Sequence, residues 1–593
     1  MKYLLGQETE YAIRFDPAPG HKHPGNLKLF KALKYGIRQV VKTSPGERDF
    51  IQHQFFVENG GAFYYEHLPY ASDDGLIEGS TPECSGPAEA LLYQRAQEKL
   101  LTRAMEHAYS YLGRHQIRGT LGLIKNCRDH LGNTYGAQEN YETEPTSGFD
   151  LFAYRLAGVL YLPAYIFQWV VMPLLEIVFY LAMGLGTLAC AAIQYPLELM
   201  GKIIPGRAWK GLFFALAMRF ELTGYYIRAP LLEPSLLETI MYHVLLRPWM
   251  IVLIPLGFAL RLFVFRKQRR VLTAFLASRA IISGAGTLRR DGTLALGEKL
   301  EAVRRINRFT IGPDDRPLFD NGNLQKDLLL GAREVLLLRK NSLKRTLAPP
   351  RRLQLGASDS NRAEFAEYLK FGTTLLVLRA CEAGYLDDAP ILKHPVRAIH
   401  TLNGDPSLKA RATIRPNKAR SSARAGGDLT SLEIQRLYLA AVQRFLKAAK
   451  HIPLEYHEIA RSWKQTLDAL ERDPSELIGR LDWVSKRYLM ETAGAGSSFA
   501  VKKKIDIAYH ELERGYFDKL REAGIAPRIT RPEDVERAVH EPPSPESAQA
   551  RAGLIKGLLF PGKPVTVSWN TARVGRMGER RVVSLDEFRK REN

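Results

Sequence analysis

The sequence predicts an α+β protein built from two or more structural units, one of them a hydrophobic helical insertion. Three observations lead to this fold class. At 593 residues the chain exceeds the size that one hydrophobic core usually supports. Its composition, 46% hydrophobic and 25% charged, is typical of a folded protein. Short alternating segments near the N-terminus predict strands, whereas the chain becomes almost free of charge after Asp150.

The first predicted strand is segment 6–11, Gly-Gln-Glu-Thr-Glu-Tyr. Because side chains alternate across a strand, Glu8 and Glu10 are expected on one face, with Thr9 and Tyr11 on the other. Two neighbouring carboxylates repel each other unless a cation neutralises them, so the pair suits a hard ion such as Mg²⁺. A solvent-facing acidic strand is the alternative.

Two further segments place polar side chains in strand patterns. Segment 59–67 predicts a glycine turn and then a strand with Tyr64 and Glu66 on one face, and a helix is expected to begin near Pro87. Segment 125–141 predicts two short strands joined by a glycine-containing turn. The polar residues at the ends of these strands are expected to face a pocket.

The insertion is the part of the chain that is poorest in charge. Between Ala157 and Leu197 the only charged residue is Glu176, and about 20 apolar residues suffice to cross a bilayer. A second apolar run, 248–260, is short for a span, and 211–232 has the mixed pattern of an interfacial helix. A soluble helical insertion is the alternative, but so large an apolar surface favours a membrane.

The position of the insertion limits its topology. If the regions before and after it build one domain, both lie on the same side of the membrane, which requires an even number of spans or a re-entrant hairpin. Seven basic residues are expected at the cytoplasmic face under the positive-inside tendency: Lys202, Arg207, Lys210, Arg266, Lys267, Arg269 and Arg270.

Net charge and cysteine content limit the partners and the compartment. The chain has 84 basic and 63 acidic residues, a net charge of +21, which suits nucleic acid, an anionic membrane or an acidic protein. Since no groove-reading motif is present, no nucleic acid is expected. The four cysteines are scattered, which argues against disulfides and structural zinc. No secretory signal is recognisable at the N-terminus, which is therefore expected in the cytoplasm.

Taken together, the motifs resemble the Pup ligase and Pup deamidase (depupylase) family, whose catalytic domain is related to glutamine synthetase and other carboxylate–amine ligases. The family's G-x-E-T-E-[YF], N-G-A-R-x-Y-x-D, H-P-E-Y-x-[TS]-x-E and K-N-N…S-Y-G-x-H-E-N-Y segments correspond in order to segments of residues 6–141. Further similar segments follow the insertion, at 282–286, 352–361, 432–436, 481–484, 506–510 and 568–570. The resemblance covers most of the chain outside about 151–268.

The resemblance implies a glutamine-synthetase-like fold, with a curved antiparallel sheet backed by helices and a small C-terminal domain. The expected organisation is an N-terminal part of the catalytic domain (1–150), the hydrophobic insertion (151–268), the remainder of the catalytic domain (269–500) and the C-terminal domain (501–593).

The resemblance also implies a site. Glu8, Tyr64 and Glu78 correspond to the residues around Mg²⁺, and Thr81 and Trp569 to residues near ATP. Glu66 stands where the family has its catalytic Asp. Further candidates for the pocket are Glu10, Glu83, Asn126, Gln138, Glu139 and Asn140.

The implied chemistry runs in either of two directions. ATP can phosphorylate a glutamate side-chain carboxylate, which a lysine amine then attacks, and Glu66 would deprotonate that amine. In the reverse direction, the same carboxylate helps to hydrolyse an amide or isopeptide bond.

Several positions depart from the family pattern. Glu66 is one methylene longer than Asp, and near-attack geometry is sensitive to about 1 Å. Ala62 stands where the family has an ATP-contacting Arg. Gln138 and Gln354 stand where it has His, and an amide cannot switch protonation as imidazole does.

The sequence therefore predicts an enzyme that uses ATP and Mg²⁺ to form or cleave an amide or isopeptide bond at a Glu or Gln carboxyl. Its expected partners are a small Pup-like modifier or a protein substrate, and lipid through residues 151–268, at the cytoplasmic side of the cell membrane. A catalytically degenerate nucleotide-binding scaffold and a small-molecule carboxylate–amine ligase remain alternatives.

Overall fold

The computed structural model describes residues 3–46, 53–68, 71–125, 128, 134–161, 170–232, 254–307, 316–320, 324, 328, 331, 335, 337, 342–416, 427–494, 496–575 and 581–585. The chain forms two compact units. The main unit comprises Met1–Pro145, Phe265–Asn321 and Arg351–Asn593, and the insert unit comprises Thr146–Val264 and Gly322–Pro350. The predicted insertion, 151–268, falls mostly within the insert unit, but the return of the chain to this unit at 322–350 was not predicted.

The main unit is organised around a ten-stranded sheet with the order β10-β11-β12-β7-β1-β5-β4-β3-β2, in which β6 also pairs with β1. Neighbouring strands run antiparallel except for the parallel pair β10 and β11. The predicted α+β class with a largely antiparallel sheet is confirmed. The strands are β1 Leu5–Pro17, β2 Thr43–Pro45, β3 Phe55–Val57, β4 Ala62–Leu68, β5 Ala71–Ser80, β6 Gly119–Lys125, β7 Ala137–Glu142, β10 Arg305–Asn307, β11 Pro317–Asp320 and β12 Arg352–Ser358.

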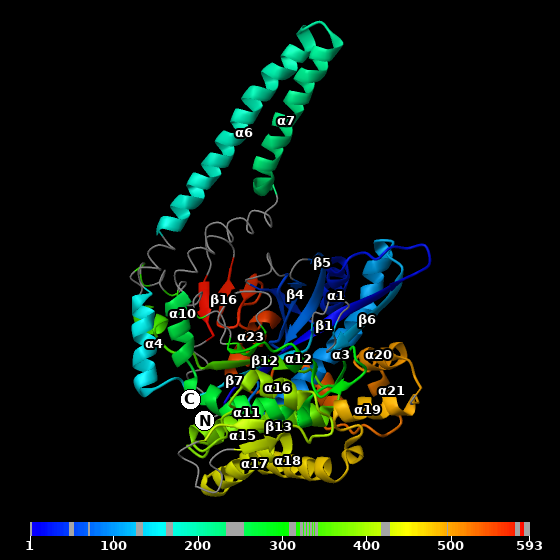
Figure 1. Cartoon of the computed structure of the whole chain (residues 1–593), viewed down its shortest axis with the longest axis vertical. Helices are drawn as coiled ribbons and strands as arrows, with labels where there is room; N and C mark the ends of the chain where they lie inside the picture. Colours follow the sequence, from blue (N-terminus) through cyan, green and yellow to red (C-terminus); the bar gives the residue numbers. More distant parts are fainter. Residues whose placement is uncertain are drawn as a thin grey trace. The chain divides into compact units, whose positions relative to one another are not determined.

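Helices cover one face of this sheet (Figure 1). The long helix α3 begins at Pro87, as predicted, and α11 and α15 contact the same sheet face through the side chains described below. Helices α17 and α18 pack against α11 and α15 as a further layer. The helices are α1 Asn26–Val40, α3 Pro87–Arg114, α11 Arg266–Ser283, α12 Glu298–Glu301, α15 Glu364–Glu382, α16 Pro395–Asn403, α17 Ser431–Ala448, α18 Leu454–Arg472, η4 Pro474–Leu477, α19 Asp482–Thr492, α20 Phe499–Ala508 and α21 Tyr516–Glu522. Two small hairpins join β8 Thr287–Leu288 to β9 Leu294–Ala295, and β13 Arg411–Ile414 to β14 Gly427–Thr430.

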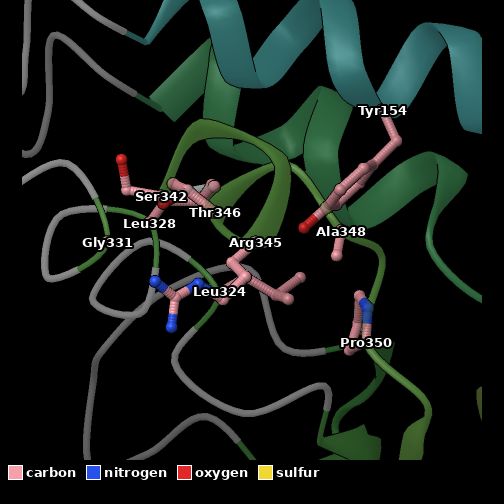
Figure 2. A pocket seen from close by; sticks show the side chains of 9 residues that line it. All are labelled: Tyr154, Leu324, Leu328, Gly331, Ser342, Arg345, Thr346, Ala348 and Pro350. Atoms are coloured by element: carbon pink, nitrogen blue, oxygen red, sulfur yellow. The ribbon is translucent and has the colours of Figure 1, made fainter. Parts of the chain in front are cut away.

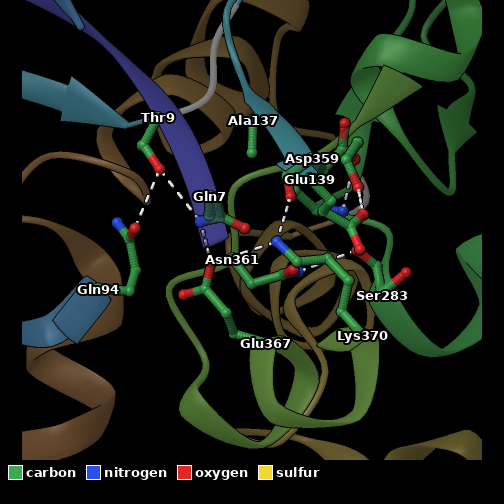
Figure 3. A network of polar contacts seen from close by, with 12 residues as sticks. Gln7, Thr9, Gln94, Ala137, Glu139, Ser283, Asp359, Asn361, Glu367 and Lys370 are labelled. Carbon is green, nitrogen blue, oxygen red and sulfur yellow. Dashed lines mark hydrogen bonds and ion pairs between the residues drawn. The ribbon is translucent and has the colours of Figure 1, made fainter. Parts of the chain in front are cut away.

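The interface between the sheet and its helices is polar as well as apolar (Figure 3). The amide Nε2 of Gln7 on β1 donates to Glu367 on α15 over 2.8 Å. Glu367 also pairs with Arg95, with Lys125 at 3.1 Å and with Lys370 at 3.2 Å. Burial opposes the charge of Glu367, but the attraction of these three cations outweighs it and lowers the pKa of the carboxyl. The network thereby ties β1, α3 and α15 together.

The C-terminal segment packs on the β2–β3–β4 edge of the sheet. It contains α22 Pro532–His540, α23 Glu546–Lys556 and a three-stranded sheet of β15 Val565–Val567, β16 Thr571–Val574 and β17 Arg581–Ser584. Phe56 of β3 and Ala62 of β4 share a buried apolar cluster with Leu554, Val567 and Ala572. This contact places the C-terminal strands beside the strand that carries Tyr64 and Glu66.

The insert unit contains α4 Gly148–Leu160, α6 Met172–Ile203, α7 Arg207–Leu232, α10 Ile254–Phe263 and α14 Ser342–Thr346. Helices α6 and α7 lie side by side as a long antiparallel hairpin (Figure 1). The first six residues of the predicted apolar run 248–260 lie outside the described residues.

The insert unit also contains a cavity of about 280 Å³ (Figure 2). It is lined by Tyr154, Leu324, Leu328, Gly331, Ser342, Arg345, Thr346, Ala348 and Pro350. None of these belongs to the predicted site.

Candidate active site

The predicted metal residues share one face of the large sheet. Glu10 of β1 is opposite Glu78 of β5, and Glu78 is in turn opposite Tyr64 of β4. Directly opposed residues in an antiparallel pair point to the same face, and residues two apart on a strand do so as well. Glu8 and Glu66 therefore join this set, and the three strands β1, β4 and β5 contribute to one acidic face.

The alternation predicted for the first strand is confirmed. Thr9 and Tyr11 point to the helical side, where their hydroxyls donate to Gln94 and Gln97 of α3 over 3.1 and 3.0 Å. Glu8 and Glu10 therefore occupy the other face of β1.

Several acidic side chains lie close together on this face and repel one another. Burial, and then repulsion from Glu66 and Glu8, raise the pKa of Glu78 well above its ordinary value. Burial, followed by repulsion from Glu10, raises the pKa of Glu66 to about 7. Burial together with Glu78 and Glu8 likewise raises the pKa of the Tyr64 phenol. Such mutual perturbation in a group of acidic side chains is typical of functional sites.

Cations from other segments reach this face. Lys299 of α12 approaches Glu10 to 3.1 Å, and Arg352 of β12 approaches Glu8 to 2.9 Å. The positive charges of Lys299 and Arg316 partly offset the rise in the pKa of Glu66. Sequence reasoning did not single out Lys299 or Arg316, because neither belongs to a recognisable motif, although Arg352 does begin a family-like segment.

The two glutamines that replace family histidines are neighbours. The amide of Gln354 on β12 donates to the amide oxygen of Gln138 on β7, and also lies 3.4 Å from a carboxylate oxygen of Glu8. The two departures therefore occur at one place, where two amides form a hydrogen bond that does not depend on pH.

The residues predicted near ATP lie at the edge that meets the C-terminal segment. Thr81 is buried, and its hydroxyl accepts the backbone N–H of Gln7 over 3.0 Å. Glu83 binds both terminal nitrogens of Arg551 over 2.7 Å. The Arg551 guanidinium lies 4.6 Å from the Trp569 ring centroid and donates to the Trp569 carbonyl. One buried arginine thus links the Thr81 segment to Trp569.

Two of the pocket candidates lie elsewhere than expected, and one cannot be placed. Glu139 is fully buried on the helical side of β7, where it pairs with Arg279 at 2.6 Å. The prediction for Glu139 was wrong because its neighbours Gln138 and Asn140 face the acidic side, and alternation sends Glu139 to the other. Glu83 forms an ion pair with Arg551 and is not part of the acidic face. Asn126 lies outside the described residues.

The acidic face fits a divalent cation in its chemistry. Oxygen donors are what Mg²⁺ prefers, and Oε1 of Glu78 is buried without a hydrogen-bond donor among the described residues. A cation beside Glu78, Glu8 and Tyr64 would relieve both the repulsion and the missing partner. Within the described part of the chain, no three His, Cys, Asp or Glu side chains are close enough together to hold a metal on their own. The fit therefore rests on two carboxylates and a phenol.

Comparison with protein families gives a match over nearly the whole chain. Residues 3–573 match the family described as Pup-ligase protein. The chain belongs to the Pup-ligase protein family. The resemblance inferred from the motifs is confirmed, and with it the expected enzyme class, a carboxylate–amine ligase.

Two relatives in this family match along nearly their full length. The Pup–protein ligase of Acidimicrobium ferrooxidans is 31% identical over 599 residues, covering 99% of this chain and 95% of the relative. The Pup–protein ligase of Paenarthrobacter aurescens is 31% identical over 606 residues, covering 99% of this chain and 96% of the relative. The Mycobacteroides abscessus enzyme is 33% identical over a shorter segment of 247 residues, covering 40% of this chain and 52% of the relative.

Two solved structures share the fold. The crystal structure of Pup in complex with its ligase PafA aligns with a TM-score of 0.62 at 18% identity, over 100% of this chain and 92% of that one. The structure of the Pup ligase PafA in complex with ADP aligns with a TM-score of 0.57 at 19% identity, over 96% of this chain and 92% of that one. The predicted fold is thereby confirmed.

Proposed function

We propose that this chain uses ATP to join a glutamate carboxylate of a small Pup-like protein to a lysine amine of a protein substrate. The observation that carries the proposal is the acidic face shared by β1, β4 and β5, where the pKa of Glu66 is raised to about 7. Full-length similarity to Pup–protein ligases supports it, as do neighbours of the same fold that bind Pup and ADP.

The reaction has two steps. The γ-phosphoryl group of ATP passes to the glutamate carboxylate, which gives an acyl phosphate and ADP. The lysine amine then attacks the acyl carbon, phosphate leaves with its electron pair, and the ammonium proton passes to Glu66. A carboxylate whose pKa is about 7 can accept this proton near neutral pH and release it again.

The remaining residues bind and position the reactants. Glu8, Tyr64 and Glu78 would hold Mg²⁺, which when bound neutralises charge on the phosphates of ATP. Thr81 and Trp569 are proposed to contact the nucleotide, and Arg551 keeps Trp569 in place.

We also propose that the insert unit holds this enzyme at the cytoplasmic side of the cell membrane, where it would act on proteins close to that surface. The support is the long apolar helix α6, whose most apolar stretch is 6% buried.

The direct test is conjugation by purified full-length protein with ATP, MgCl₂ and the Pup of Acidimicrobium ferrooxidans. We expect ADP release together with a mass increase of a lysine-containing protein by one modifier. Glu66→Gln should reduce turnover by about 10²–10⁴-fold, the usual contribution of a general base, with ATP affinity nearly unchanged. Glu66→Asp, which restores the family residue, serves as the matched control and should retain turnover.

Other results would replace the proposal with one of its alternatives. Tight ATP binding without ADP release would favour a degenerate scaffold. ADP release with a modified small amine and no gain in protein mass would indicate a small-molecule ligase. Loss of mass from a conjugated protein would show the hydrolytic direction.

A further inference from the structure

Helix α6 presents an apolar surface to its surroundings along its length. Residues 177–197 contain no Asp, Glu, Lys or Arg, and at about 1.5 Å per residue this stretch is about 30 Å long, the thickness of a bilayer's hydrocarbon core. Leu181, Leu185 and Leu188 are 61%, 66% and 66% exposed. A helix that is apolar all round is stable in a protein core or in lipid, and α6 is not in a core.

The contact between α6 and α7 includes small residues on both helices. A Cβ placed on Gly224 would lie 3.2 Å from the Cβ of Cys190, and one on Gly201 would lie 3.2 Å from the Phe214 ring. Ala217 is also buried in this hairpin. A hairpin in water buries its large apolar side chains and exposes small or polar ones. In this hairpin Met183 is buried as well as the small residues, but Leu181, Leu185 and Leu188 are exposed, as expected of helices that pack through small residues within lipid.

The sheet shows that the chain enters and leaves the insertion on one side. Strand β7 precedes the insertion and pairs with β12, which follows it, over a register that includes Tyr141 opposite Leu353. If α6 enters a bilayer, the chain must return, and within the described residues α7 is the helix that packs along α6.

We propose that the α6–α7 hairpin inserts into a lipid bilayer as one packed pair, closed end first, and returns to the side from which it entered. The inference rests on the membrane location proposed above and specifies its partner, lipid, and its topology. Helix α6 provides the apolar surface. Helix α7 covers the small-residue seam of α6 and is itself more polar, with Arg219 and Glu221 of opposite charge in its middle.

The closed end carries positive charge. Lys202 and Lys210 are exposed there, beside Trp209, which is 58% exposed. Lysine and tryptophan are the residues that favour the headgroup region. The seven basic residues expected at the cytoplasmic face belong to two groups. Lys202, Arg207 and Lys210 lie at the closed end of the hairpin, whereas Arg266, Lys267, Arg269 and Arg270 begin α11 in the main unit.

Flotation with vesicles of phosphatidylcholine and phosphatidylglycerol tests the partner. The full chain should float with the vesicles, and the double variant Leu181→Lys, Leu188→Lys should bind at least ten-fold less. The control Leu454→Lys, Leu558→Lys changes two leucines of the main unit that are at least as exposed, 71% and 72%, and should float like the parent. ATP affinity measured on the same samples separates loss of lipid binding from loss of the nucleotide site.

Cysteine variants test the topology. Gly224→Cys should form an intramolecular disulfide with Cys190 in vesicle-bound protein, because the two Cβ atoms would be close to disulfide separation. Gly211→Cys near the closed end has no neighbour within 4 Å and should form none. A membrane-impermeant maleimide added outside the vesicles should label Gly211→Cys only after detergent opens them, with the parent protein as the baseline.

Three outcomes would overturn the proposal. The first is full-length protein that stays in the soluble fraction and buries the hairpin in a dimer of this chain, as detected by light scattering. The second is loss of the Cys190 disulfide upon vesicle binding, which would mean that the helices separate. The third is labelling of Gly211→Cys without detergent, which would place the hairpin flat on the surface.

Discussion

The fold opposes the negative charge of Glu78. Its Oε1 is buried without a donor among the described residues, and its pKa is raised by burial and by Glu66. Between pH of about 4.5 and 7, folded Glu66 holds a proton that the unfolded chain has lost, since its pKa rises from 4.5 to about 7. The free energy of unfolding therefore falls as pH rises through this window.

This electrostatic strain predicts a pH-dependent effect of Mg²⁺ on stability. Mg²⁺ should raise the melting temperature more at pH 8, where Glu66 is mostly ionised, than at pH 5.5, where a proton already neutralises it. Differential scanning fluorimetry without nucleotide measures this shift. In Glu78→Gln the difference between the two pH values should shrink, and an equal Mg²⁺ effect at both would argue against a cation on this face.

The rate of conjugation should depend on the protonation of Glu66. If Glu66 is the base, kcat/KM rises by about ten-fold between pH 6 and pH 8, because this parameter reports the free enzyme, whose Glu66 pKa is about 7. Gln138 and Gln354 cannot titrate, so these positions add no second pH dependence. A flat pH profile for conjugation over this range would exclude Glu66 as the base.

For single residues, the sequence predicts which side chains of one strand share a face better than it predicts contacts between distant segments. Alternation along one strand sufficed to place Glu8 and Glu10 together and Thr9 and Tyr11 apart from them. Lys299 and Arg551 were missed, because their partners Glu10 and Glu83 are hundreds of residues away and no local period or motif marks such a pair.

At the scale of elements, α23 and the small C-terminal sheet complete the nucleotide edge of the site. Arg551 of α23 is fully buried, binds Glu83 at the end of the β5 segment and lies over the Trp569 ring. The sequence predicted both Thr81 and Trp569 as ATP residues by resemblance, but the arginine that connects their segments is visible only in the fold.

Replacing this arginine should weaken ATP binding. Lysine cannot form the bidentate contact or the planar stack, so Arg551→Lys should raise the KM for ATP by about ten-fold with little change in kcat. Intrinsic fluorescence of Trp569 should shift as its ring loosens. Arg573→Lys on the exposed side of β16 is the control, and an unchanged KM in Arg551→Lys would remove the positioning role.

The charge network beneath the sheet should govern stability rather than chemistry. Glu367→Gln leaves three buried cations partly unpaired, and breaking a buried ion pair costs about 3–5 kcal/mol. Urea unfolding should show a loss of this order, whereas Asp468→Asn, in the exposed pair with Lys464, should change stability by less than about 1 kcal/mol. Equal effects for the two variants would contradict the structural importance of the network.

For the whole molecule, composition and motif order predicted the α+β fold and the position of the insertion. The strand motifs repeat the family's order, and the loss of charge after Asp150 marks the point where the chain leaves the main unit. The return at 322–350 was not foreseen, since the leucine-rich runs at 328–330 and 335–338 do not reveal which unit they pack in. The packing of α6 against α7 also required the structure, because it depends on which residues face each other.

The acidic face is proposed to direct ATP to a glutamate carboxylate that a lysine then attacks. Oxygen transfer measures this most directly: a modifier whose reactive glutamate carboxyl is labelled with ¹⁸O is incubated with ATP, MgCl₂ and an acceptor protein. An acyl phosphate leaves one carboxyl oxygen on the phosphate when the amine displaces it, so we expect ¹⁸O in the released phosphate and its loss in Glu66→Gln. Conjugation with no ¹⁸O in the phosphate would contradict it.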